Sequence, residues 1–283
     1  RGRWAGHDPD GGRAVMRGAS RASYAGLREG LSAISTADSA DRVGDELFAV
    51  VRLLDSEHGL RRALADPTKP PEEKAAVAGR LLHGKVSAET EELVVAAVSA
   101  RWASSSDLAD AIEQLAIEAF TVSAQRRHKL DDLEDDLFRF GRLVSGQPAL
   151  RSALIGPAPE NAKRDLLANL LEDKVSSPSM SLITQLLTHT RGRSPQAALD
   201  LAAGIAARRR EQLIAVVRVA TELTAEQRRR LGETLTAAYG QGIHLNVVHD
   251  PAVIGGVSIQ IGDELIEGTA ASRLAEVRRK LAG

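Results

Sequence analysis

The sequence predicts a mainly helical protein, with two tandem helical bundles followed by a small β-α-β-β-α domain. Apolar residues recur with the 3.6-residue period of an α-helix from about residue 20 to 212. A similar helical pattern returns after about 90 residues, and beyond residue 212 the two-residue alternation of β-strands appears. Aromatic residues make up only 3% of the chain, which favours close-packed helices over a β-sandwich. The expected segments are a linker (1–19), a first bundle (20–128), a second bundle (129–211) and a C-terminal α/β domain (212–283).

The chain begins with a Gly- and Arg-rich segment and one amphipathic helix. Residues 1–19 contain no apolar core of a signal peptide, so we interpret them as a linker. Residues 20–34, SRASYAGLREGLSAI, place Tyr24, Leu27 and Leu31 on one face of a helix. The sequence therefore predicts one extra helix before the first bundle.

An internal repeat organises the region between this helix and residue 212. The apolar positions of residues 47–54 recur at 137–144, and many other residues agree at offsets of 90 and then 89. The identical pairs include Leu60/Leu150, Arg61/Arg151, Ala63/Ala153, Leu64/Leu154, Pro67/Pro157, Lys74/Lys163, Leu81/Leu170, Leu82/Leu171, Lys85/Lys174 and Val86/Val175. Two Leu- and Ala-rich helix sets resemble each other by chance, but amphipathicity does not require shared prolines, arginines and lysines. We therefore interpret 129–211 as a repeat of 40–128.

The last 70 or so residues predict a small α/β domain. A strand rich in β-branched residues precedes a helix that begins with a capping box formed by Thr224 and Gln227. Two further strands alternate their inward positions, which are Ile243, Leu245, Val247, Val257, Ile259 and Ile261. Gly262 and Asp263 then predict a two-residue hairpin turn. A final helix is expected from its apolar positions, Leu274, Val277 and Leu281.

Composition excludes several classes of protein. Lys and Arg number 37 against 38 Asp and Glu, so no net field attracts nucleic acid or an anionic membrane. The chain has no cysteine, which removes disulfides, thiolate nucleophiles and sulfur-ligated metals. The longest apolar run, residues 93–98, is far shorter than the roughly 20 residues that span a bilayer.

No motif in the sequence indicates catalysis. The stretch VIGGVSIQIGDELIEGT (253–269) is rich in glycine, but it lacks the Lys-Ser/Thr of a Walker loop and the spacing of a dinucleotide fingerprint. A turn explains Asp263 better than a metal or acid/base role. The histidines show no metal-ligand spacing; they are His7, His58, His83, His128, His189, His244 and His249. We expect no catalytic residue, metal, cofactor or small-molecule substrate.

Two arginine clusters leave a nucleic-acid-binding or adaptor module as the alternative. They are Arg208 to Arg210 and Arg228 to Arg230. Solvated or ion-paired helix faces explain most such runs, and no aromatic residues for base stacking lie between these arginines. We therefore expect no nucleic-acid partner.

The C-terminal stretch resembles a known family. DPAVIGGVSIQIGDELIEGT followed by ASRLAEVRRKL resembles the C-terminal signature of the δ subunit of F-type ATP synthases, relatives of the mitochondrial oligomycin-sensitivity-conferring protein. The matching residues are Asp250, Gly255, Gly256, Gly262, Asp263 and Gly268. Glu267 and Thr269 depart conservatively from the family's Asp and Ser, and Tyr24 is similar to the tyrosine of the family's first helix.

The resemblance implies a non-catalytic stator subunit of the peripheral stalk. It implies that the helical part binds the N-terminal peptides of the α subunits of the catalytic head, with Tyr24, Leu27 and Leu31 as a candidate contact. It further implies that the C-terminal domain binds the b-type stalk helices, and that the complex lies at the cytoplasmic face of the plasma membrane. An ordinary member of the family has no room for residues 40–128, which the duplication explains. We also expect the natural chain to extend upstream as a membrane helix and a b-like helix, with residues 1–19 as the hinge.

Overall fold

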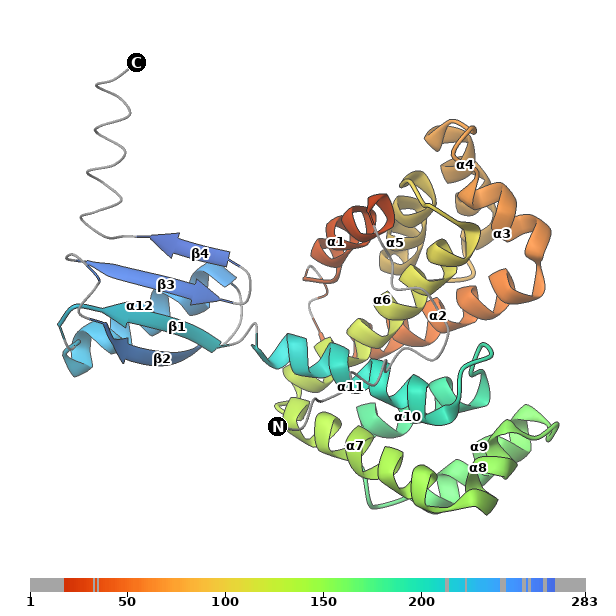
Figure 1. The fold of residues 1–283 in the computed structure, drawn as a ribbon. Helices are drawn as coiled ribbons and strands as arrows, with labels where there is room; N and C mark the ends of the chain where they lie inside the picture. The colour runs from red at the N-terminus through yellow and green to blue at the C-terminus, as the bar shows by residue number, and fades with distance from the viewer. Residues whose placement is uncertain are drawn as a thin grey trace, which may run out of the picture. The chain divides into compact units, whose positions relative to one another are not determined.

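The computed structural model describes residues 18–32, 34, 36–211, 214–221, 223–239, 243–250, 253, 256–261 and 264–267. The chain forms two compact units, residues 1–206 and 207–283, which we describe separately. It is mainly helical, with a small mixed sheet towards its C-terminal end (Figure 1), and this confirms the predicted fold class.

Helices joined by short connections make up the first unit. In chain order they are α1 (Ala19–Ser32), α2 (Ala37–Ser56), α3 (His58–Ala65), α4 (Pro71–Leu82), α5 (Ala88–Ser99), α6 (Ser105–Arg126), α7 (Leu130–Gly146), α8 (Pro148–Ile155), α9 (Glu160–Leu171), α10 (Ser177–Thr188) and α11 (Pro195–Glu211). The hydroxyls of Thr36, Ser87 and Ser104 accept hydrogen bonds from backbone N–H groups in the first turns of α2, α5 and α6. These caps satisfy donors that have no partner within the helix, so they determine where the helices begin. We call α1–α6 the first half and α7–α11 the second half.

Helix α6 lies at the centre of the first unit. Almost every residue from Leu108 to Ala124 is buried, because α6 packs along α2 and also contacts α1, α3, α5, α7 and α10 (Figure 1). The approach to α2 is closest at Gly44, where an added Cβ would lie 2.6 Å from the ring of Phe120. The rings of Phe48 and Phe120 lie 6.2 Å apart between their centroids. A helix that is buried on all sides is the core around which the others assemble.

The second unit contains a four-stranded sheet and one described helix. Its elements are β1 (Ile214–Val219), α12 (Ala225–Tyr239), β2 (His244–His249), β3 (Val257–Ile261) and β4 (Glu264–Glu267). The strand order is β2-β1-β3-β4, with β1 and β2 parallel and the other pairs antiparallel. The predicted capping box is confirmed, because Thr224 N–H donates to Gln227 Oε1 and Gln227 N–H donates to Thr224 Oγ1.

The predicted hairpin is also confirmed. Ile261 pairs with Glu264, so two residues connect β3 to β4. The strand β4 is additional to the expected β-α-β-β-α order, although the turn signal before it was present in the sequence. The expected last helix, with Leu274, Val277 and Leu281, lies outside the described residues.

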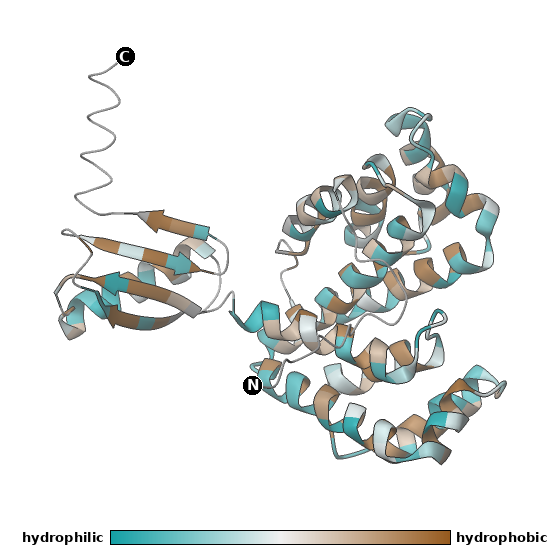
Figure 2. Cartoon of the chain, in the orientation of Figure 1, coloured by the Kyte–Doolittle hydropathy of each residue, from teal (hydrophilic) through white to brown (hydrophobic). Residues whose placement is uncertain are grey.

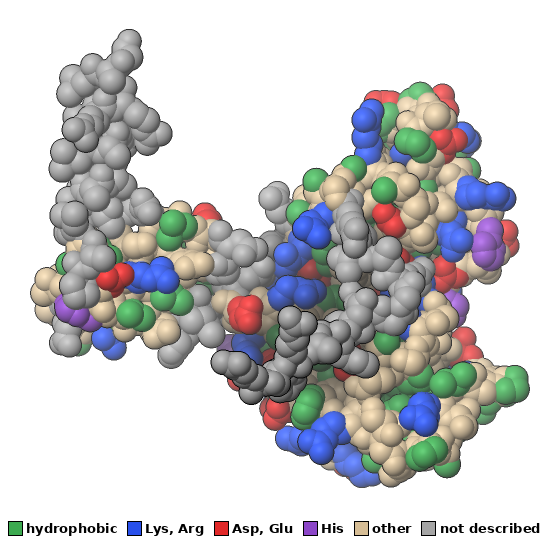
Figure 3. Space-filling model, viewed as in Figure 1, with side chains coloured by type: hydrophobic (Ala, Val, Ile, Leu, Met, Phe, Trp, Pro, Cys, Tyr) green, Lys and Arg blue, Asp and Glu red, His purple; other side chains and the backbone are tan. Residues whose placement is uncertain are grey.

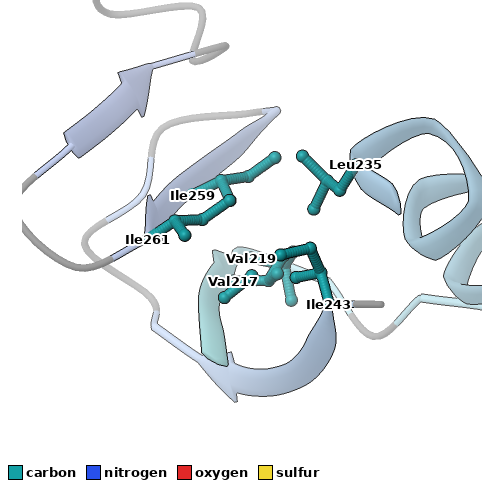
Figure 4. Close-up of a cluster of buried hydrophobic side chains, with 7 residues drawn as sticks. Val217, Val219, Leu235, Ile243, Ile259 and Ile261 are labelled. Atoms are coloured by element: carbon teal, nitrogen blue, oxygen red, sulfur yellow. The ribbon is translucent and has the colours of Figure 1, made fainter. Parts of the chain in front are cut away.

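The core of the second unit lies between one face of the sheet and α12. Hydrophobic residues run along all four strands (Figure 2). Val217, Val219, Ile259 and Ile261 point towards Leu235 of α12, and Ile243 joins them (Figure 4). The two-residue alternation read from the sequence therefore predicted the buried face correctly. No described element of this unit covers the opposite face of the sheet.

Substitutions at two helical glycines test the close contact between α2 and α6. Gly44 lies at the contact, and Gly26 of α1 is the control. We expect Gly44→Ala to destabilise the protein by about 1–3 kcal/mol, because its Cβ would overlap the Phe120 ring. We expect Gly26→Ala in α1 to stabilise it by up to about 1 kcal/mol, because nothing lies within 4 Å of the added Cβ and alanine favours helix. Urea unfolding followed by fluorescence of the buried Trp102, in a Trp4→Phe background, measures both changes. Equal effects of the two substitutions would contradict the close approach.

Candidate functional site

The residues that the sequence singled out in α1 attach this helix to the rest of the first unit. Leu27 and Leu31 are buried. The Tyr24 hydroxyl donates to Glu118 Oε1 at 2.6 Å, and Arg28 Nε lies 2.6 Å from the same oxygen. Because these side chains hold α1 against α6, a partner can contact only the opposite face of α1 in this structure.

The opposite face of α1 is exposed and carries small side chains. Arg21, Ala22, Ala25 and Gly26 are exposed along it. The distance between two packed helices depends on the side chains at their contact, so small residues allow close approach. This face can therefore receive another helix at short distance.

The glycine-rich motif of the second unit shapes the backbone. Gly256 has a φ of +88°, a conformation that side chains rarely adopt. The N–H of Asp250 donates to the carbonyl of Val219, and its own carbonyl accepts from Val253 in a turn. The remaining motif residues lie outside the described residues; they are Gly255, Gly262, Asp263 and Gly268. The described part of the motif supports turns.

A carboxylate in the same stretch has a structural partner. The Tyr239 hydroxyl donates to Glu264 Oε2 at 2.7 Å and so links α12 to β4. This hydrogen bond raises the pKa of Tyr239 to about 12, with burial and the negative charge of Glu264 adding to the effect. Glu264 is therefore used to hold the edge strand of the sheet.

The described histidines lie in separate local contacts. His249 Nε2 donates to the carbonyl of Ala220, His83 faces Glu91 at 3.4 Å, and His128 occupies the turn between α6 and α7 with a φ of +56°. Within the described part of the chain, no group of three or more His, Asp or Glu residues could hold a metal ion. Acidic and basic side chains are interspersed over the visible surface (Figure 3).

One open hollow of about 580 Å³ lies between α7 and the start of α10. Four basic and four acidic side chains line it: Arg127, Lys129, Arg139, Lys174, Asp132, Asp135, Asp136 and Asp173. Several of these charges pair with each other, as Lys129 does with Asp132 at 2.8 Å and Arg139 with Asp135 at 3.3 Å. This lining is unlike the mostly apolar, convergent pocket of an enzyme.

A buried ion-pair network, which sequence reasoning missed, joins the two halves of the first unit. Arg191, in the loop between α10 and α11, has a side chain that is only 2% exposed. Its Nε lies 2.6 Å from Asp55 of α2, and its Nη1 lies 2.6 Å from Glu113 and 2.9 Å from Asp110 of α6. Arg193 donates two hydrogen bonds to Glu113, at 2.6 and 2.7 Å.

Backbone geometry in this loop brings both arginines to the same carboxylate. Arg191 and Gly192 have φ values of +55° and +77°, which reverse the chain sharply between α10 and α11. Two further side chains approach Asp55: His189 Nε2 and Arg61 Nη1, each at 3.1 Å. The network therefore draws on α2, α3, α6 and the loop that follows α10.

The network stabilises the charged forms of its members. Burial raises the pKa of Asp55, but hydrogen bonds from His189 and Arg191 outweigh burial and hold this pKa well below its usual range. Burial lowers the pKa of Arg191, yet the carboxylates of Glu113, Asp110 and Asp55 outweigh it and raise this pKa. Asp55 and Arg191 are therefore both charged in the folded protein.

A neutral side chain forms a second connection between the halves. Gln185 of α10 donates from Nε2 to Asp45 at 2.6 Å and accepts at Oε1 from Arg52 at 2.7 Å, and both partners belong to α2. Apolar side chains of α10, including Leu182 and Leu186, are buried beside it. Hydrophobic packing and specific polar contacts thus act together at this interface.

The sequence does carry a signal for the network, although its partners cannot be read from it. Residues 107–120, DLADAIEQLAIEAF, place Asp110, Glu113 and Glu118 in a helix whose other residues are mostly apolar. Acidic residues within an apolar helix are expected to need cationic partners. Nothing in the local sequence shows that the partners of Asp110 and Glu113 lie about 80 residues further along the chain, or that Arg28, the partner of Glu118, lies 90 residues before it.

Polar side chains connect the helices, and the exposed face of α1 is open to a partner. These features fit a protein with a structural role in a larger complex. Similarity to known proteins identifies its family. The model of the ATP synthase delta (OSCP) subunit family matches residues 117–281. ATP synthase subunit delta of Streptomyces griseus is 46% identical over 271 residues, covering 95% of this chain and 100% of that protein. The Thermobifida fusca protein of the same name is 45% identical over 270 residues, with 95% and 100% coverage. The chain belongs to the ATP synthase delta (OSCP) subunit family.

One solved structure adds little. A chain of the Toxoplasma gondii mitochondrial ATP synthase hexamer is 16% identical, with a TM-score of 0.30 over 59% of this chain and 95% of that chain. A similarity this weak carries no argument about the fold.

Family membership confirms the function expected from the resemblance. The protein is a non-catalytic peripheral-stalk subunit of ATP synthase, and it is not an enzyme. The nucleic-acid-binding alternative finds no support among the relatives. Two arginines that suggested it are paired one helical turn away, Arg229 with Glu233 and Arg230 with Glu226.

Removing Arg191 tests the buried network. We expect Arg191→Met to lower the free energy of unfolding by about 3–5 kcal/mol, because the buried Asp110 and Glu113 and the half-buried Asp55 lose a shared cation. The control Arg229→Met removes an exposed pair and should cost less than about 1 kcal/mol. Urea unfolding at pH 7 measures both. A cost for Arg191→Met as small as that of the control would contradict a stabilising network.

The acid dependence of stability tests Asp55. The pKa of Asp55 is lower in the folded protein than in the unfolded chain, where it is about 3.9. The charge of Asp55 should therefore stabilise the fold fully above about pH 3.9. This stabilisation should be lost as the pH falls towards the folded-state pKa. We expect the stability difference between the natural chain and Asp55→Asn to be constant from pH 7 to 5 and to shrink below about pH 4. Urea titrations across this range measure it. A difference that stays constant below pH 4 would contradict a lowered pKa of Asp55.

Proposed function

We propose that the first half binds the catalytic head through the N-terminal peptides of its α subunits, with the exposed face of α1 as the contact. The observation that carries this proposal is the difference between α1 and α6. Helix α1 directly precedes α2, and α6 directly precedes α7, the first helix of the second half. Helix α6 is buried on all sides, whereas α1 keeps Arg21, Ala22 and Ala25 exposed. Only α1 has a face that a partner helix can reach.

We propose that residues 40–128 and 130–212 are two copies of one helical unit. Helices α3 and α8 have corresponding bounds at an offset of 90, and α4 and α9, like α5 and α10, correspond at 89. These are the offsets at which the sequence repeats. The halves differ at their last helix, because α6 packs along the whole of α2 whereas α11 touches α7 mainly through Gln196.

A shared polar contact supports this relation between the halves. Glu46 of α2 accepts hydrogen bonds from Ser87 and Thr90 at the start of α5. The corresponding residue of α7, Asp136, accepts from the N–H of Ser176 at the start of α10. In both halves a carboxylate of one helix, α2 or α7, thus caps the third helix after it, α5 or α10. Local helix propensity does not require a contact between two helices 40 residues apart.

We propose that the second unit binds the b-type stalk helices with the uncovered face of its sheet. Val248 is 40% exposed and Leu265 is 53% exposed. The pairing of the strands puts both on the face opposite the core, together with Val216 and Gln260. Arg218, Asn246 and Ser258 lie on the same face, so it offers both apolar and polar contacts to an amphipathic helix.

The family relationship supports a location at the cytoplasmic face of the plasma membrane, within the ATP synthase complex. No helix among the described residues is long and apolar enough to cross a membrane. In the proposed arrangement this chain contacts the membrane part of the complex through the stalk helices.

Two matched substitutions test the proposed contact with the head. Ala25 in α1 and Ala76 in α4 are both exposed helical alanines. We expect Ala25→Arg to weaken binding to the purified catalytic head by about tenfold or more, because a long charged side chain prevents close helix packing, while Ala76→Arg leaves it unchanged. Surface plasmon resonance measures both, and circular dichroism checks the fold. Equal binding by the two variants would show that the head contacts another surface.

A further inference from the structure

One arginine lies near the centre of the uncovered face of the sheet. The pairing of the strands puts Arg218 of β1 between Val248 of β2 and Ser258 of β3. Among the side chains that the structure describes on this face, Arg218 carries the only charge; the others are Val216, Asn246, Val248, Ser258, Gln260 and Leu265. The face therefore combines apolar and neutral polar groups with a single positive charge.

No carboxylate pairs with the Arg218 guanidinium among the described residues. Its Nη1 donates to Gln260 Oε1 at 3.4 Å, a long distance for a hydrogen bond. The backbone of Glu267 lies on the same side of the sheet, opposite Ser258. Glu267 belongs to β4, however, and two strand spacings of together about 9–10 Å separate β4 from β1. The half-buried Arg218 is thus left with a neutral acceptor.

Buried arginines of the first unit have charged acceptors. Arg61, Arg191 and Arg193 each contact a carboxylate at 3.1 Å or less. Such a contact offsets the loss of water around the cation. A partner that covers the open face of the sheet would also remove water from Arg218. A carboxylate is the acceptor that forms the strongest hydrogen bonds with a guanidinium, so Arg218 favours a partner with an acid at this point.

The apolar residues of the face indicate how a helix would lie on it. Val248 is on the edge strand β2, and Leu265 is on the other edge strand, β4. Three strand spacings separate these edges by roughly 14 Å, the length of about ten residues of α-helix. Arg218 is the neighbour of Val248 across one spacing. A helix laid across the strands would therefore carry its acid about three or four positions from the residue that covers Val248.

Charge distinguishes between candidate occupants of this face. A second copy that paired through the same face would bring another Arg218 against the first. The stretch 268–283 has the same sign of charge as Arg218, because it contains Glu276 against Arg273, Arg278, Arg279 and Lys280. A separate amphipathic helix with an acid in its apolar stripe complements the charge of the face.

We propose that the b-type stalk helix bound by this unit places an Asp or Glu side chain against the guanidinium of Arg218, three or four positions from an apolar residue that covers Val248. The proposal rests on the assignment of stalk binding to this face. Many helices can cover the apolar residues of the face, whereas Arg218 disfavours a helix that lacks an acid at this place. Arg218 thus determines which helix binds and in which register.

Calorimetric binding of the full chain to the extramembrane part of the purified b-type subunit tests the role of Arg218. We expect Arg218→Glu to raise the dissociation constant by about tenfold or more, because two carboxylates then face each other. Arg218→Gln should raise it less, and added salt should weaken the natural chain more than this variant. Arg229→Glu makes the same charge change at an exposed site of α12 and, as the matched control, should bind like the natural chain.

A variant of the apolar residues separates this proposal from the assignment of stalk binding. We expect the double variant Val248→Ser and Leu265→Ser to weaken binding. If it does so while Arg218→Glu binds like the natural chain, the face binds the stalk and the recognition of an acid is wrong. If neither variant weakens binding, both proposals are wrong. Circular dichroism checks the fold, and Arg218→Gln with natural affinity and salt dependence would overturn the role of Arg218 even if Arg218→Glu unfolds the unit.

Charge exchange identifies the acid of the partner. Each Asp and Glu of the b-type helix is replaced by Lys in turn and measured against the natural chain and the Arg218→Glu chain. We expect one replacement to weaken binding to the natural chain and to restore binding to the Arg218→Glu chain. The absence of any restoring replacement would refute the proposal. So would a benzophenone side chain at position 248 that crosslinks, in purified ATP synthase, to residues 268–283 or to a second copy instead of the b-type helix.

Discussion

Burial of carboxylates on α6 is the constraint on which the arrangement of the helical unit depends. Asp110, Glu113 and Glu118 are each less than 10% exposed in the most buried helix of the chain. A buried carboxylate without a partner is strongly unfavourable, so cations must reach each of them. Arg28 reaches Glu118 from α1, and Arg191 reaches the other two from the loop after α10. Apolar packing draws the helices together, while these pairs determine where α1 and the second half lie on α6.

This arrangement suits a protein that connects the parts of a larger complex. Ion pairs depend on distance and direction, whereas apolar contacts tolerate small shifts, so the buried network favours one relative position of the two halves. Asp55 receives Arg191, Arg61 and His189 together, which ties α2 to the second half as well as to α3. Because these polar groups are used internally, the proposed partner contacts fall to other surfaces, namely α1 and the open face of the sheet.

Local structure could be predicted from the sequence to the extent that its causes are local. The capping box at Thr224, the two-residue hairpin after Ile261 and the inward alternation of the strands are all confirmed, because each depends on residues within a few positions. The candidate contact in α1 shows the limit of such reasoning. A stripe of Tyr24, Leu27 and Leu31 predicts that one face is buried, but it does not distinguish burial within the chain from burial against a partner. In the structure, the chain's own α6 accounts for Tyr24, through Glu118.

The sequence by itself determined where helices and strands occur, the repeat of about 90 residues, and the family, because periodicity, capping residues and motif spacing are properties of short segments. Only the tertiary structure decided which copy of a repeated pattern is covered. Phe48 and Phe138 lie 90 residues apart, in segments (45–52 and 135–142) that agree at four of eight positions, yet one is buried and the other is exposed. The difference arises from contacts between residues distant in the chain, such as that of Phe48 with Phe120 across 72 positions. No pattern within a helix records such a contact, because it depends on how the whole chain folds back on itself.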